Sequence, residues 1–210
     1  MGAKNKTEKF WDRLANQFDK QSKHFEKPPS EKAKRFLNIN DIVLDYGCAT
    51  GTVTTELSEY VKEIKGIDIS SGMINIARKK AIERCIENID FMHTTIDDEE
   101  LKKNSFNVII AFNILHFFQD TQLVLQRINE LLKPGGLIII STACLGERTV
   151  SNFFQNAIFT PFIKFGIIPY MKFFTISELK GYIESENFKI DDLINQDSST
   201  NYFIVAKKLN

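Results

Sequence analysis

An apolar run that ends in an acidic residue and a glycine-bearing loop constrains the fold of this chain more than any other feature. The run Ile42–Leu44 is followed by Asp45. The next residues form a loop with Gly47 and Gly51, and a helical pattern begins near Thr52. Glycines let a ligand approach bare backbone next to the unpaired N–H groups of a helix start. A strand, a turn and a helix in this order predict a ligand-binding end of an α/β sheet.

The spacing within the loop narrows the class of ligand. Asp45, Gly47 and Gly51 form the pattern Asp-x-Gly-x-x-x-Gly. Dinucleotide-binding folds instead use Gly-x-Gly-x-x-Gly to place a pyrophosphate on the helix, and no Gly-Lys-Ser or Gly-Lys-Thr follows to indicate a nucleoside triphosphate site. The loop therefore predicts a nucleoside ligand without a polyphosphate.

Strand and helix patterns alternate along most of the 210 residues. Strands are expected over 42–46, 63–69, 88–93, 106–112 and 137–142, and helices over 7–18, 30–37, 52–62, 70–84, 120–132 and 175–185. The strands are apolar at nearly every position, whereas a sheet with one solvent-exposed face would alternate apolar and polar residues. We therefore expect a parallel sheet with helices on both faces. Residues 133–136, Lys-Pro-Gly-Gly, predict a sharp stop and turn. The last two strands, 188–194 and 201–207, are expected to pair antiparallel across residues 197–199.

The charge balance and the cysteines exclude several classes of partner. The chain carries 27 basic and 27 acidic side chains and has a pI near 6.8, so no overall field attracts nucleic acid or an anionic membrane. Cys48, Cys85 and Cys144 are widely separated and accompany no histidine cluster, which predicts neither disulfides nor a metal site. Because we find no signal-peptide pattern and no run of 18 apolar residues, we expect a cytoplasmic protein without an integral membrane segment.

The loop resembles the first motif of the class I S-adenosylmethionine-dependent methyltransferases. Segments 104–110 and 131–136 also resemble sequence motifs of that family. Segment 10–19 is similar to the N-terminal cover of the subfamily that methylates quinones and other small molecules. The resemblance covers nearly the whole chain. It implies S-adenosylmethionine as the cofactor and a doubly wound, Rossmann-like sheet of seven mostly parallel strands that ends in an antiparallel hairpin.

One domain over 1–210 is expected, with a small-molecule acceptor as its partner and a monomeric or homodimeric state. Its parts would be an N-terminal helical cover (1–38), a cofactor-binding core (39–143), an aromatic-rich substrate lid (144–175), and a C-terminal helix with a hairpin (176–210).

Residues at the carboxyl ends of the strands are the cofactor-binding candidates, because parallel strands present these ends to one crevice. Asp68 ends the second strand, 17 residues after Gly51. Its two carboxylate oxygens can accept hydrogen bonds from both ribose hydroxyls, a role that the resemblance also implies, although it could instead be a turn or capping aspartate. Asp45 would orient the loop or reach the methionine ammonium through water. The full set is Asp45, Gly47, Cys48, Ala49, Gly51, Asp68, Ile69, Met73, Thr95, Ile96, Asp97 and Asn113.

The end of the third strand departs from the family pattern. Relatives often place an aspartate here that accepts the adenine amino group, and Thr95 stands at that position. Thr95 or Asp97 could take the amino group, while Ile96 could offer its backbone amide and an apolar wall. Residues 97–100 also fit a solvated helix start, which the helix dipole favours.

The end of the fourth strand holds the candidate for acid–base catalysis. Residues 111–116 resemble the fourth family motif and would place Asn113 near the transferable methyl group. His116 is the histidine placed to act as a base, and the alternative is a packed, hydrogen-bonded histidine.

Residues 149–174 contain eight aromatic side chains and few charges. We interpret this segment as part of a substrate lid for a flat or apolar acceptor, with a dimer contact or core packing as alternatives. The lid candidates are Phe18, Phe153, Phe154 and Tyr170.

These features predict methyl transfer by in-line displacement to a small, apolar or aromatic acceptor. The alternative is a non-catalytic sensor or partner subunit that binds S-adenosylmethionine or its demethylated product. A nicotinamide dehydrogenase would need a third glycine in the loop and a catalytic Tyr-Lys or His pair, which we do not find.

Overall fold

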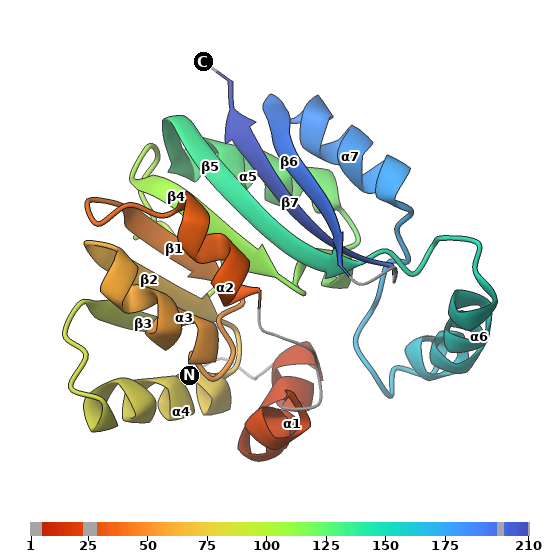
Figure 1. Cartoon of the computed structure of the whole chain (residues 1–210). Helices are drawn as coiled ribbons and strands as arrows, with labels where there is room; N and C mark the ends of the chain where they lie inside the picture. The colour runs from red at the N-terminus through yellow and green to blue at the C-terminus, as the bar shows by residue number, and fades with distance from the viewer. Residues whose placement is uncertain (1–5, 23–28, 197–199, 210) are drawn as a thin grey trace.

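A seven-stranded sheet organises the computed structural model, which describes residues 6–22, 29–196 and 200–209 (Figure 1). The strand order is β3-β2-β1-β4-β5-β7-β6, and all neighbours from β3 to β5 are parallel. β7 pairs antiparallel with both β5 and β6. The strands are β1 (Ile42–Tyr46), β2 (Glu63–Asp68), β3 (Ile89–His93), β4 (Phe106–Phe112), β5 (Leu132–Ala143), β6 (Phe188–Gln196) and β7 (Asn201–Lys208). This confirms the predicted fold, while the expected turn at 197–199 lies outside the described residues.

Helices cover both faces of the sheet because its strands are apolar on both sides. Neighbouring strand residues such as Val43 and Leu44 are fully buried in two separate clusters, one on each face. The Leu44 cluster includes side chains of α5 and α7, and the Val43 cluster includes side chains of α2 and α3. The helices are α1 (Lys6–Ser22), α2 (Ser30–Ala33), α3 (Thr52–Leu57), α4 (Ser71–Glu83), α5 (Thr121–Leu131), α6 (Val150–Lys164) and α7 (Ile176–Ser185), with 3₁₀ turns η1 (Lys34–Phe36), η2 (Ser58–Tyr60) and η3 (Leu115–Phe117).

Chain order reverses between β1 and β4, which lie side by side in the middle of the sheet. β2 and β3 continue from β1 on one side, whereas β4 and β5 continue on the other. Loops after such central strands diverge and leave a ligand-binding crevice at the carboxyl ends. α1 and α6 both lie outside the two core clusters, and Figure 1 shows α6 standing away from the sheet. None of the helices in the described part of the chain has the length and apolarity that a bilayer span requires.

Several predicted boundaries differ from the structure. The helix expected over 30–37 is divided into α2 and the η1 turn, and the helix expected over 7–18 extends over Lys6–Ser22. β5 begins at Leu132, because Leu132 pairs with Phe106 and Leu137 then pairs with Val108. The Lys-Pro-Gly-Gly segment is therefore an irregularity within the strand, where Pro134 has no N–H to place in a ladder. The helix expected over 52–62 ends at Leu57 and continues as the η2 turn.

Gly51 is required by its neighbours as well as by its backbone conformation. Its φ is +72°, and a Cβ atom there would lie 2.6 Å from Phe91 and 2.8 Å from Ala77. Gly166 has a similar φ of +66°, but a Cβ on it would meet nothing within 4 Å. A substitution at Gly166 would therefore cost backbone strain alone, whereas the same substitution at Gly51 would add steric overlap with Phe91 and Ala77.

We expect Gly51→Ala to lower the free energy of unfolding by about 2–4 kcal/mol, because left-handed strain adds to overpacking. Gly166→Ala is the matched control and should cost about 1–2 kcal/mol from strain alone. Urea denaturation of both variants measures the difference. Equal losses would show that the contacts of Gly51 with Phe91 and Ala77 relax without cost.

Candidate active site

Asp68 lies where β2 meets the glycine loop and α4. Its Oδ2 accepts a hydrogen bond from the Ala49 N–H at 3.1 Å, and its Oδ1 accepts one from the Ser70 N–H at 2.8 Å. Burial raises the pKa of this carboxyl, while the two backbone hydrogen bonds oppose the rise. A carboxylate offers about four acceptor positions, so Asp68 can accept further donors from a ligand.

Asp45 has a different role from Asp68, because it is 3% exposed. The Thr54 hydroxyl donates to Asp45 Oδ2 at 2.6 Å and so connects β1 to α3. Burial raises the Asp45 pKa to about 6, against the effect of this hydrogen bond. Of its two expected roles, this geometry supports orienting the loop.

The glycine loop is shaped by contacts within the protein. Gly47 has a φ of +75°, and a Cβ atom on it would lie 2.9 Å from the Ile114 side chain. Cys48 is buried, and burial raises the pKa of its thiol. Ala49 also has a positive φ, of 48°, which directs its N–H to Asp68. Cys48, one of the cofactor-binding candidates, thus packs into the protein beside Phe91 and Ala77.

The first residues of α4 continue the Asp68 site. Ser70 caps the helix, since its side chain accepts from the Met73 N–H at 3.1 Å. Met73 is almost fully buried, whereas Ile69 is partly exposed. The structure thus brings Asp68, Ile69 and the glycine loop together and leaves Met73 beneath them.

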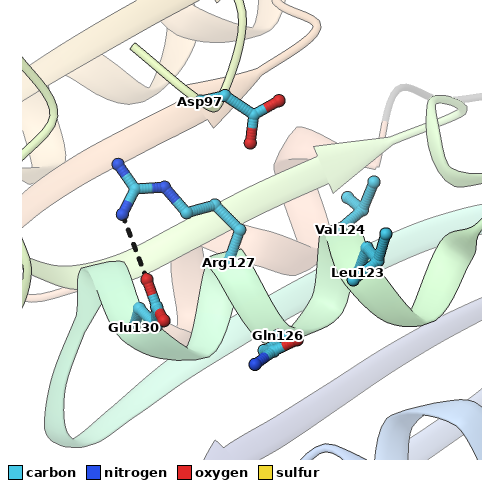
Figure 2. A pocket seen from close by; sticks show the side chains of 6 residues that line it. All are labelled: Asp97, Leu123, Val124, Gln126, Arg127 and Glu130. Atoms are coloured by element: carbon cyan, nitrogen blue, oxygen red, sulfur yellow. Dashed lines mark hydrogen bonds and ion pairs between the residues drawn. The ribbon is translucent and has the colours of Figure 1, made fainter. Parts of the chain in front are cut away.

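The loop after β3 separates its three candidates by exposure. Thr95 and Asp97 are exposed, while Ile96 is 2% exposed and belongs to the core. Arg127 of α5 holds this loop, because its Nε donates to the Ile96 carbonyl at 3.1 Å. Asp97 lines a hollow of about 330 Å³ along α5, and Figure 2 shows Arg127 paired there with Glu130. Thr95 and Asp97 both stay candidates for a hydrogen bond to adenine.

His116 lies on the η3 turn directly after β4. Its Nδ1 is 3.4 Å from the Thr142 hydroxyl, and its ring centroid is 4.1 Å from that of Phe117. Burial lowers the His116 pKa to about 4, so its imidazole is neutral at pH 7. Asn113, just before this turn, is exposed with a φ of +53° and donates its N–H to the Ser141 carbonyl at 2.7 Å.

The N-terminal helix lies within the segment predicted to cover the site, but Trp11, Asp12 and Asp19 were not among the predicted site residues. Trp11 of α1 packs edge-on against Phe117 with ring centroids 5.2 Å apart, and Phe18 is partly buried. Asp12 accepts from the Ser70 hydroxyl at 2.7 Å, and Asp19 accepts from the Thr50 hydroxyl at 2.5 Å. The signal that could have found these acids is their helical spacing with the buried Ala15. α1 therefore lies across the carboxyl ends of the strands, next to the loops around Asp68.

The aromatic segment is largely on the surface. Phe153 is 71% exposed and Phe154 is 62% exposed, and their rings pack edge-on at 5.8 Å. Tyr170 is 37% exposed, whereas Phe174 is fully buried. The alternative interpretation of this segment as core packing is therefore wrong for Phe153 and Phe154, whereas Phe174 does pack in the core.

A family model for a methyltransferase domain matches residues 37–195. The chain belongs to the methyltransferase family. S-adenosylmethionine is the methyl donor of this domain. The described residues fit that cofactor, because Asp68 keeps acceptor positions for ribose hydroxyls at the end of β2, beside the glycine loop whose Ala49 N–H it accepts.

Curated relatives agree with this assignment, and a solved structure shares the fold. The chain is 26% identical over 182 residues to the ubiquinone biosynthesis O-methyltransferase of Azorhizobium caulinodans, covering 79% of this chain and 70% of that protein. It is 28% identical over 199 residues to the enzyme of the same name from Rickettsia bellii, covering 85% and 80%. An S-adenosylmethionine-dependent methyltransferase structure from Methanosarcina mazei has a TM-score of 0.70 at 20% identity and covers 88% of this chain and 99% of that one.

The low pKa of His116 has a consequence for stability. Between about pH 6.5 and pH 4 the unfolded chain binds a proton at this histidine that the folded protein does not, so stability falls as pH falls through this range. We expect wild type to lose more unfolding free energy than His116→Gln between about pH 7 and pH 5. Urea denaturation at both pH values measures this, with His93→Gln as control. Equal losses in wild type and His116→Gln would contradict a depressed pKa.

Proposed function

We propose that this methyltransferase transfers the methyl group by in-line displacement to a small, apolar or aromatic acceptor. The observation that carries the proposal is the Asp68 carboxylate, held by two backbone N–H groups at the end of β2 with acceptor positions to spare. The named relatives, which are O-methyltransferases of ubiquinone biosynthesis, support a small-molecule acceptor. The exposed aromatic side chains of α6 support an apolar one.

The chain's own residues would bind and orient the cofactor. Asp68 accepts the ribose hydroxyls, and the backbone of residues 47–51 holds the methionine end. Ile69 provides apolar surface for the adenine, Ile96 offers its backbone amide, and Thr95 or Asp97 accepts the adenine amino group. The bound cofactor supplies a methyl carbon that its sulfonium already activates. The protein then gains most by fixing the acceptor in line and excluding water.

His116 would remove a proton where the acceptor is a phenol or an enol. Its neutral imidazole at pH 7 is free to accept a proton, although a pKa near 4 makes it a weak base. Such a weak base works best on an acceptor whose hydroxyl group has a low pKa, because that hydroxyl gives up its proton readily. Asn113, at the end of β4, would lie beside the methyl group.

Four parts of the single domain would share this work. Residues 1–38 cover the site, 39–143 bind the cofactor, 144–175 close over the acceptor and 176–210 complete the sheet. Phe18, Phe153, Phe154 and Tyr170 would contact the acceptor. Their partial exposure is what a lid needs in order to close on a ligand.

Asp68→Ala should weaken binding of S-adenosylmethionine by about 1.5–3 kcal/mol, the usual contribution of hydrogen bonds to a charged group. Asp90→Ala is the matched control, because it removes an exposed carboxylate from the neighbouring strand β3. Isothermal titration calorimetry measures both affinities. An unchanged affinity in Asp68→Ala would remove the ribose assignment.

Replacing Phe153 and Phe154 together by Ser should raise the acceptor KM about tenfold, because aromatic contacts contribute about 0.5–1.5 kcal/mol each. Unfolding free energy should barely change, since both side chains are largely exposed. The acceptor for the assay comes from a screen of phenols and quinols for release of demethylated cofactor. Ile82→Ser, at a 76% exposed position on α4, is the control. An unchanged KM would reject the lid, and a loss of dimer mass in scattering would assign the patch to a dimer contact.

A further inference from the structure

α1 presents an acidic face to the protein. Glu8, Asp12 and Asp19 are spaced by four and seven residues and so share one side of the helix with the buried Ala15. This spacing usually carries apolar side chains toward a core. Here each acid meets a polar partner on the body of the protein instead. Glu8 pairs with His93 at the end of β3 at 3.3 Å.

Asp12 reaches the turn between β2 and α4. Its Oδ1 accepts from the Ser70 hydroxyl at 2.7 Å and from the Gly72 N–H at 3.0 Å. Ser70 in turn donates its N–H to Asp68 Oδ1 at 2.8 Å. A Cβ atom on Gly72 would lie 3.2 Å from both Ala15 and the Asp12 carboxylate, so α1 approaches α4 very closely here (Figure 1). Asp12 therefore holds one of the two donors of Asp68.

Asp19 reaches the glycine loop. Its Oδ1 accepts from the Thr50 hydroxyl at 2.5 Å, and its Oδ2 pairs with Lys80 Nζ at 2.7 Å. Lys80 also donates to Thr50 Oγ1 at 3.1 Å, which closes a three-residue network. Burial opposes ionisation of Asp19, but the hydrogen bonds and charge of Lys80 with Thr50 keep its pKa below the ordinary value. Thr50 directly follows Ala49, whose N–H donates to Asp68 Oδ2.

We propose that Asp12 and Asp19 are positioning residues for the cofactor site. They hold Ser70 and the Ala49–Thr50 segment, and these supply the two N–H groups that orient Asp68. The inference rests on the proposed ribose role of Asp68. Hydrogen bonds to an ionised carboxylate are stronger than neutral ones, so both contacts favour one geometry of the loops before the cofactor arrives. Without them, cofactor binding must supply the ordering.

The test compares Asp12→Asn and Asp19→Asn with wild type. Each should weaken binding of S-adenosylmethionine and S-adenosylhomocysteine about tenfold in calorimetry, the scale of one charge-assisted contact. The KM for S-adenosylmethionine should rise while kcat changes little. Asp19→Glu keeps the charge and should recover most of the affinity. Glu83→Gln is the matched control, because Glu83 is an exposed acid on α4 that pairs only with Lys79 among the contacts seen in the described chain.

A charge-free variant supplies an independent readout. Gly72→Ala should separate α1 from α4 and weaken cofactor binding to a similar extent, with Asp12 still present. Thermal unfolding of the ligand-free proteins should shift by no more than a few degrees, because α1 lies outside both core clusters. Salt should weaken binding to wild type more than to an Asp12→Asn/Asp19→Asn double variant.

Two results would overturn the proposal. Affinities within about twofold of wild type in Asp12→Asn, Asp19→Asn and Gly72→Ala would show that α1 has only a structural role. A strong fall in the melting temperature of these variants, with an unchanged affinity per folded molecule, would likewise show that α1 has only a structural role. Asp68→Ala separates this failure from failure of the proposed function. If Asp68→Ala weakens binding and the α1 variants do not, only the positioning role is lost.

Discussion

The two backbone hydrogen bonds to Asp68 are the contacts on which the site depends. They join the glycine loop after β1 to the start of α4 after β2, so one carboxylate fixes the relative position of two loops that are far apart in the sequence. The parallel pairing of β1 with β2 brings both loops to the same edge of the sheet. Partial burial makes these bonds stronger than they would be in water, and it also raises the pKa of Asp68.

Sterics shape the same region as much as hydrogen bonding does. Gly47 and Gly51 were expected to let a ligand approach the backbone, yet a side chain at either position would first meet the protein itself. Ile114 occupies the space beside Gly47, and Phe91 and Ala77 occupy the space beside Gly51. The loop is thus preformed by packing. A preformed loop lowers the ordering cost of ligand binding.

Outside this centre, the methyltransferase has two helices that the sheet does not need. α1 is held across the strand ends by acids and by Trp11, whereas α6 carries exposed phenylalanines. The polar contacts of α1 and the exposed rings of α6 add little to the folding free energy, because partly exposed charge pairs contribute little and exposed rings bury little apolar surface. Their residues can therefore be used for the cofactor and acceptor sites.

The sequence by itself determined the strands, most helices and the acid at the end of β2. These follow from local patterns of apolar periodicity, glycine and capping residues, as at Ser70. The seven-stranded, mostly parallel sheet with its antiparallel hairpin then followed from the family resemblance, whereas the strand order came from the structure. Boundaries that depend on pairing, such as the early start of β5 at Leu132, were not readable, because a partner strand defines them.

Only the tertiary structure decided the contacts between distant residues. Asp12 meets Ser70 across 58 positions of sequence and Asp19 meets Thr50 across 31, and no local pattern encodes such pairs. The low pKa of His116 likewise comes from burial, and the exposure of Phe153 and Phe154 comes from how α6 leaves the sheet. Periodicity specifies what a segment is, whereas burial and charge environment depend on what the fold places beside it.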